Sequence, residues 1–133
     1  MKRLLVVALI VLCGACEHDN APVAGMLNVT LTTPNSGGDR AILLKISGPE
    51  ALTSAAASGT LRLFAQPPFG TPGTTGYQTS QFVLTGTLSA GRILTIGVAD
   101  VGKAGSYVAT VQQVSTPAYQ LRGLTGYSLS VAP

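Results

Sequence analysis

Apolar and polar residues alternate in short runs along most of the chain, a pattern typical of strands that bury one face. The first run, which begins at Met26, places Leu27, Val29 and Leu31 on one side of the backbone. The same pattern predicts further strands at 42–47, 61–64, 81–88, 92–98, 107–114 and 127–131. Turn-forming residues separate these runs at 33–39, 89–91 and 100–105, and residues 67–80 form a long Gly/Pro/Thr-rich loop.

Two segments fit the pattern less well. Residues 50–58 are rich in alanine and follow Pro49, but they lack an apolar stripe long enough for a stable helix, so we expect irregular structure or a weak strand. Residues 119–121 are a candidate short strand. With seven to nine short strands and no convincing helix, residues 26–133 are predicted to form a single all-β domain, a Greek-key or jelly-roll-like β-sandwich.

The first 16 residues have the features of an export signal. Lys2 and Arg3 precede an unbroken apolar run from Leu4 to Leu12, which is too short to span a membrane. The run ends in Cys13-Gly14-Ala15-Cys16, and the small residues before Cys16 resemble the lipobox of bacterial lipoproteins. Cys13 departs from that motif, which usually has an aliphatic residue there.

The resemblance implies a signal-peptide helix at 1–15, removed on export, and a diacylglyceryl lipid on the Cys16 thiol. Residues 16–25 then form a lipidated tether to the cell envelope. Glu17 after the cysteine favours the outer membrane or its periplasmic side. The alternative is ordinary secretion with cleavage near Ala15.

Loss of this leader changes what the composition means. The whole chain has a formal charge of +3, but without Lys2 and Arg3 six Lys/Arg remain against five Asp/Glu. These six are scattered singly, so no basic patch indicates nucleic-acid binding. Both cysteines lie at or before Cys16, so the domain has no disulfide, and its stability must come from its core.

Few residues remain for catalysis or metal binding. The single histidine, His18, lies in the tether, and the domain carries the carboxylates Asp39, Glu50 and Asp100. Asp39 and Asp100 occur in turn sequences, where we expect them to accept hydrogen bonds from nearby backbone N–H groups. We therefore expect no enzyme activity, no cofactor and no metal site.

The aromatic residues divide into two groups. Phe69 and Tyr77 lie in the long loop and are candidate ligand contacts, on sugars or on a protein partner, unless they fold back to cover the end of the sandwich. The remaining aromatics within strand patterns are expected to be buried or half-buried: Phe64, Phe82, Tyr107 and Tyr127.

Three segments resemble cohesin and carbohydrate-binding-like sandwiches of secreted bacterial proteins. They are residues 41–49 (AILLKISGP), 94–98 (LTIGV) and 107–111 (YVATV), and the likeness lies in strand order and patterning. Cohesins bind dockerin modules through a sheet face, so the resemblance implies protein–protein binding, although it transfers no individual residue.

The sequence thus predicts a membrane-anchored, non-catalytic domain that binds an envelope protein or gives structural support. The alternative is a carbohydrate-binding module that uses Phe69, Tyr77 or a glutamine-rich sheet face. The glutamines in question are Gln78, Gln81, Gln112, Gln113 and Gln120.

Overall fold

The structure is a computed structural model that describes residues 21–65, 69, 71–72 and 77–133. Its elements are β1 (Gly25–Thr32), β2 (Asp39–Gly48), β3 (Ser54–Ala57), β4 (Arg62–Phe64), β5 (Thr71–Pro72), β6 (Gln78–Leu88), β7 (Gly91–Val98), the 3₁₀ helix η1 (Val101–Ser106), β8 (Val108–Ser115) and β9 (Ser128–Ala132). The predicted signal-peptide helix, the lipidated Cys16 and parts of the long loop lie outside the described residues.

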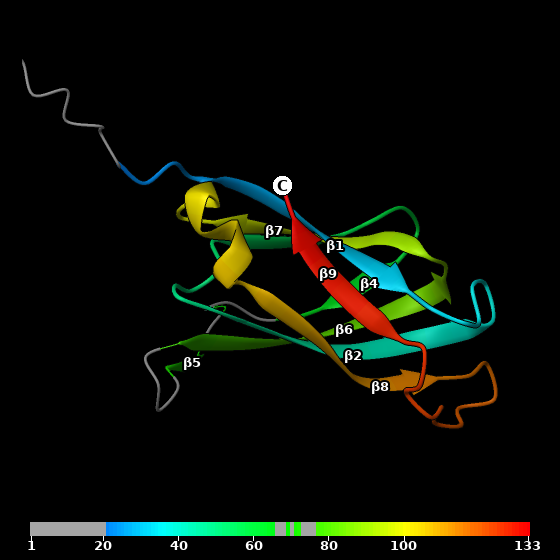
Figure 1. The fold of residues 1–133 in the computed structure, drawn as a ribbon. Coiled ribbons are helices and arrows are strands. Elements are labelled where there is room, and N and C mark those ends of the chain that lie inside the picture. The colour runs from blue at the N-terminus through cyan, green and yellow to red at the C-terminus, as the bar shows by residue number, and fades with distance from the viewer. Residues whose placement is uncertain (1–20, 66–68, 70, 73–76) are drawn as a thin grey trace, which may run out of the picture.

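The strands form two antiparallel sheets, as Figure 1 shows. One sheet has the order β3-β7-β1-β9 and the other β4-β6-β2-β8, with β5 pairing to β6 beside that path. Each of the first four strands pairs with a partner from the second half of the chain, in reverse order: β1 with β9, β2 with β8, β3 with β7 and β4 with β6. These pairs correspond to one long hairpin folded into two layers. This arrangement confirms the predicted all-β sandwich.

The core lies between the two sheets and follows the alternation in the sequence. Leu27, Val29 and Leu31 of β1 are buried, and so are Ile42, Leu44 and Ile46 of β2. Side chains at alternate positions of a strand point to opposite faces, so one face of each sheet is apolar and faces the other sheet. Burying a side chain of this size contributes about 1.5–3 kcal/mol, which makes this layer the main source of stability.

The two ends of the sandwich differ in what they hold. At one end, the tether end, the described chain begins and η1 lies beside β1 (Figure 1). At the other, the loop end, β1 turns into β2 through residues 33–38, β6 into β7 through 89–90, and β8 into β9 through 116–127. The last of these connections is the orange segment opposite η1 in Figure 1.

Residues 54–57 form the strand β3, which agrees with the second of the two expectations for residues 50–58. Other segments depart in detail from the sequence prediction: the strand β6 begins at Gln78 within the predicted loop, and the turn at 100–105 is the 3₁₀ helix η1. The candidate strand at 119–121 is wrong, because only one bridge, from Leu121 to Ser115, pairs this segment. None of the helices among the described residues is long and apolar enough to cross a membrane.

Close packing of an aromatic ring on a glycine holds the tether end together. The ring of Tyr107, just before β8, lies so close to Gly48 at the end of β2 that a Cβ there would be 2.2 Å from a ring carbon. Nearby, Phe69 is bridged to Leu52, and its ring lies 5.7 Å from that of Phe82 between centroids. This end is therefore organised by apolar contact.

Candidate binding surface

The outer surface of the β4-β6-β2-β8 sheet, which we call the β2/β6 face, carries a row of apolar side chains. Phe64, Val83 and Leu43 stand opposite one another on β4, β6 and β2, and Gln113 of β8 completes the row. Residues directly opposite on antiparallel strands share a face, so these side chains lie side by side. Phe64 is 54 % exposed and Val83 36 %, an unusual surface position for an aromatic ring next to an aliphatic side chain.

Sequence reasoning placed Phe64 among the buried or half-buried aromatics, and that prediction is wrong. Leu61-Arg62-Leu63-Phe64 offers an apolar residue to either face of its strand. Leu63 packs against the core, which turns Phe64 outward, and the guanidinium carbon of Arg62 lies 6.0 Å from the centroid of the Phe64 ring.

A hollow of about 400 Å³ borders this row at the loop end. It is lined by Arg40 and Ala41 at the start of β2, by Thr85 of β6, and by residues 115–117 and Tyr119 after β8. A shallower depression of about 190 Å³ shares Ala41 and Ser115 with it and continues over the apolar row to Leu121. The row and the two hollows thus form one continuous surface.

Tyr119 projects from a strained loop at the rim of this hollow. Its side chain is 93 % exposed, and its φ of 62° is the only left-handed value for a non-glycine residue in the described chain. The hydroxyl of Thr116 accepts hydrogen bonds from the N–H groups of Ala118 and Gln120, each at 3.2 Å, and the N–H of Tyr119 donates to the carbonyl of Thr116. Such strain in a well-bonded loop is frequently associated with function.

A buried carboxylate fixes the segment that carries Tyr119. Asp39 is 1 % exposed, and its carboxylate accepts a hydrogen bond from Nε of Arg122 at 2.8 Å and from the hydroxyl of Tyr127 at 2.5 Å. The amide of Asn35 donates to the same hydroxyl at 2.8 Å. The hydrogen bond to Asp39 raises the pKa of the Arg122 guanidinium above its ordinary value. The network ties residues 122 and 127 to the start of β2.

This network corrects the interpretation of Asp39 as a local turn residue. Its partners lie 83 and 88 residues further along the chain, a distance that no local motif spans. The same interpretation is confirmed for Asp100, whose carboxylate caps η1 by accepting a hydrogen bond from the N–H of Gly102 at 2.9 Å.

The β2/β6 face carries a net positive charge, because the ion pairs of the described chain involve other basic residues. These pairs are Arg122 with Asp39 and Lys103 with Glu50, the latter at 3.1 Å and on the surface. Glu50 also raises the pKa of Lys103, through its hydrogen bond and its charge. Arg62 and Lys45 point outward from this face and Arg40 lines its hollow, and no carboxylate occurs in its cross-strand rows.

The outer surface of the other sheet, the β1/β7 face, is of a different kind. Its central row is Ala56, Thr95, Asn28 and Ala132, and the next is Arg92, Thr30 and Ser130. Small and neutral side chains predominate, and no pair of neighbouring large apolar residues occurs in these rows. Only Arg92 among them is charged.

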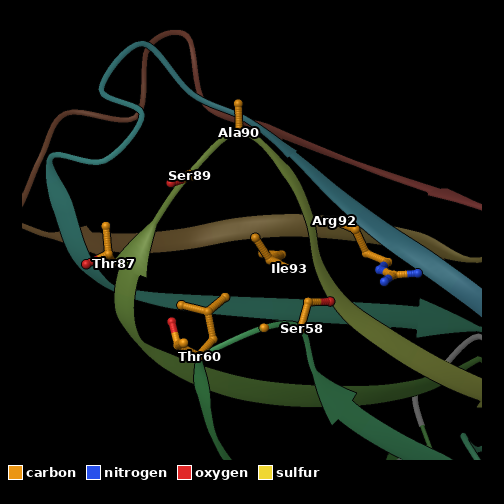
Figure 2. A pocket seen from close by; sticks show the side chains of 9 residues that line it. Ser58, Thr60, Thr87, Ser89, Ala90, Arg92 and Ile93 are labelled. Carbon is orange, nitrogen blue, oxygen red and sulfur yellow. The ribbon is translucent and has the colours of Figure 1, made fainter.

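A second pocket lies at the loop end, away from the apolar row. Figure 2 shows Ser58 and Thr60 in the lower part of the view, Thr87 and Ser89 to the left, and Arg92 to the right. Its volume is about 190 Å³, which is room for a few water molecules. The hydroxyl of Ser58 is buried without a hydrogen-bond partner in the described chain.

The two loop aromatics singled out from the sequence lie at the tether end, far from this surface. Phe69 is half-buried and packs against the core, so it covers the end of the sandwich. Tyr77 is 45 % exposed just before β6. Of the five glutamines, Gln81 and Gln113 stand exposed on the β2/β6 face, and Gln120 is exposed in the loop beside Tyr119.

Sequence reasoning missed Tyr119 and Arg40 as surface residues of this site. Nothing in Pro117-Ala118-Tyr119 indicates a left-handed backbone, since glycine and asparagine are the usual signals. Cross-strand neighbours such as Phe64 and Val83 can be identified only once the pairing register is known.

No family model matches the chain, and neither a curated protein nor a solved structure matches it. Among the residues that the structure describes, no group of three or more His, Cys, Asp or Glu side chains lies close enough to hold a metal ion.

Proposed function

We propose that the protein is an exported, lipid-anchored component of the cell envelope whose sandwich binds another envelope protein through the β2/β6 face. The observation that carries this proposal is that one face combines an exposed apolar row, an adjoining hollow and the exposed Tyr119. Aromatic anchors and pockets at the centre of an apolar patch are where protein interfaces gain most of their affinity. The resemblance to cohesin-like sandwiches favours the same use of a sheet face.

The domain acts without catalysis in this proposal. Each of the carboxylates Asp39, Glu50 and Asp100 already has a structural hydrogen-bond partner, and none of them faces the apolar row. The β2/β6 face offers shape, apolar area and charge, which suit binding.

In this proposal the Cys16 motif anchors the protein, and the anchor sets how the binding surface is oriented relative to the membrane. The described chain begins at the tether end (Figure 1). The hollow and Tyr119 lie at the loop end, where β8 connects to β9. A lipid on Cys16 would hold the tether end next to the membrane and turn the hollow away from it. Replacing Cys16 with Ala should move the protein from membranes to the soluble fraction; retention of this variant on membranes would exclude the anchor.

Site-specific photo-cross-linking in living cells tests the binding face. A photoreactive phenylalanine analogue would replace Gln113 on the β2/β6 face or, as a matched control, Ser130 on the β1/β7 face, with Cys16 intact. Both positions are exposed strand residues. We expect a reproducible protein adduct from position 113 and little from position 130. Adducts of equal yield from both positions, or none from position 113, would contradict the proposal.

A carbohydrate-binding module remains the second candidate, because Tyr77 and Tyr119 are exposed and Gln81 and Gln113 offer hydrogen bonds from the sheet face. Sugar rings stack on exposed aromatic rings while amides bind their hydroxyls. Affinity electrophoresis of the protein in polysaccharide gels tests it. Retardation that Tyr119→Ala or Tyr77→Ala abolishes would support sugar binding, and unretarded migration across a broad panel would exclude it.

A further inference from the structure

We propose that the partner of the β2/β6 face is an acidic protein segment, one that presents an apolar stripe flanked by carboxylates. This inference rests on the proposed function and specifies the chemistry of the partner. It is argued from where the charges of the described chain lie relative to the apolar row.

Positive charge flanks the apolar row on both sides. Arg62 belongs to the cross-strand row on one side, with Thr85, and Lys45 to the row on the other side, with Gln81. Alternate residues of a strand are about 7 Å apart, so each cation is within reach of a carboxylate on a partner that covers Phe64 and Val83. Arg40 adds a third cation at the hollow, where its guanidinium donates to the hydroxyl of Thr87 at 3.0 Å.

These cations have no acidic partner within the described chain. The two ion pairs found there take up Lys103 and Arg122, and Asp100 caps η1. The cations left over are Arg40, Lys45, Arg62 and Arg92, and three of these four are on or beside the β2/β6 face. An interface that places like charges together requires opposite charge on its partner, because unpaired charges at a buried interface are costly.

An acidic protein fits this face better than an anionic glycan does. The Phe64 ring already has the Arg62 guanidinium near it, at 6.0 Å from the centroid, so the ring is not a free platform for stacking a sugar. Val83 and Leu43 extend the row as aliphatic surface, which apolar side chains cover well and sugar hydroxyls do not. The matched ligand therefore has apolar side chains at its centre and carboxylates at its rim.

Charge reversal in the cross-linking experiment tests this inference. In cells that carry the photoreactive residue at position 113, Arg62→Glu and Lys45→Glu would each be compared with Arg92→Glu. Arg92 is an exposed strand arginine on the β1/β7 face, and its reversal changes the net charge by the same amount. Circular dichroism melting of each purified variant establishes that it folds.

We expect Arg62→Glu and Lys45→Glu each to lower the adduct yield by roughly three- to tenfold, and Arg92→Glu to leave it unchanged. Mass spectrometry of the adduct should place the cross-link in a segment with an excess of Asp and Glu around apolar residues. If position 113 captures a protein but charge reversal has no effect, or if the segment is neutral or basic, the acidic partner is excluded while the proposed function stands. Capture of a glycan or a lipid at position 113, or no capture at all, would overturn both.

Discussion

Each end of the sandwich packs a tyrosine against the core, but the two tyrosine hydroxyls have opposite surroundings. At the tether end, Tyr107 is 4 % exposed and lies against the backbone of Gly48, and its hydroxyl has no hydrogen-bond partner in the described chain. At the loop end, the hydroxyl of Tyr127 donates to Asp39 and accepts from Asn35. One end is held by packing and the other by a polar network around a buried charge.

This difference matters for function because the network holds the loop that presents the proposed binding surface. Arg122 lies three residues after Tyr119, and Tyr127 lies just before β9. Both side chains are hydrogen-bonded to Asp39. A loop without an apolar core of its own needs such long-range polar contacts to keep one conformation. At the tether end, the described contact that stands out is the close packing of Tyr107 on Gly48.

The largest effect is expected from a single methyl group at the tether end. Gly48→Ala should destabilise the protein by about 3 kcal/mol, because the new Cβ would lie 2.2 and 2.3 Å from two carbons of the buried Tyr107 ring. Urea unfolding measures the change. The control is Gly105→Ala, where a Cβ meets no atom within 4 Å. If both variants unfold at the wild-type urea concentration, packing does not hold this end.

At the loop end, removal of the buried carboxylate should come next in size. Asp39→Ala should cost about 2 kcal/mol, because Arg122 and Tyr127 lose a shared partner. Amide hydrogen exchange should accelerate at residues 116–126 and stay slow in β1 and β7. Asp100→Ala is the control, since it removes an exposed cap of about 1 kcal/mol together with a long hydrogen bond of 3.4 Å from the N–H of Val23. Equal effects of the two variants would mean that the network has no special role.

The sequence predicts the sheets well and the network poorly, and the two aspartates show why. Alternation reports which face of a strand is buried, and Leu27, Val29 and Leu31 are buried as predicted. Asp100 behaves as its local sequence indicates. Asp39 does not, because its role is set by residues more than 80 positions away. The pairing of β1 with β9 in one sheet and of β2 with β8 in the other brings these residues together.

The same limit applies to the candidate site. A loop position makes Phe69 and Tyr77 candidates in the sequence, whereas the apolar row consists of strand residues: exposed Phe64 and Val83 and partly exposed Leu43. The sequence around each of these three residues gives no sign that it belongs to an apolar surface. The row exists because pairing places them side by side, and pairing is not encoded locally.

The two tyrosine hydroxyls give the sharpest comparison between the ends. Tyr127→Phe should destabilise by about 1–2 kcal/mol, since it leaves a buried carboxylate without one of its donors. Tyr107→Phe should be neutral or stabilise by about 1 kcal/mol, because its hydroxyl is buried without a partner. Unfolding of both variants at neutral pH measures this; effects of the same sign would contradict the comparison.

Alkaline pH gives a second test of the burial of Tyr107. Burial raises the pKa of Tyr107 above its ordinary value of 10.0. A raised pKa means that the unfolded chain gives up this proton first, so the stability linked to it is complete below about pH 10 and is lost as pH rises through the folded-state pKa. Tyr107→Phe should therefore lose less stability between pH 9 and 11, roughly, than the wild-type protein does. If the variant and the wild-type protein lose the same stability over this range, Tyr107 does not contribute to the pH dependence.

The smallest effect on stability is expected at Tyr119, and there the consequence for binding is greatest. Tyr119→Gly removes a side chain that is 93 % exposed and relieves a left-handed backbone, so the free energy of unfolding should stay within about 1 kcal/mol of wild type. Any loss of binding by this variant can therefore be assigned to the missing side chain and not to unfolding of the protein.

Photo-cross-linking from position 113 in the Tyr119→Gly background is the most direct test that this end of the β2/β6 face is a binding surface. The account predicts that the variant folds as well as the wild-type protein and loses most of its protein adduct. An undiminished adduct from a folded Tyr119→Gly variant would contradict it, because the strained loop would then display its tyrosine to no partner.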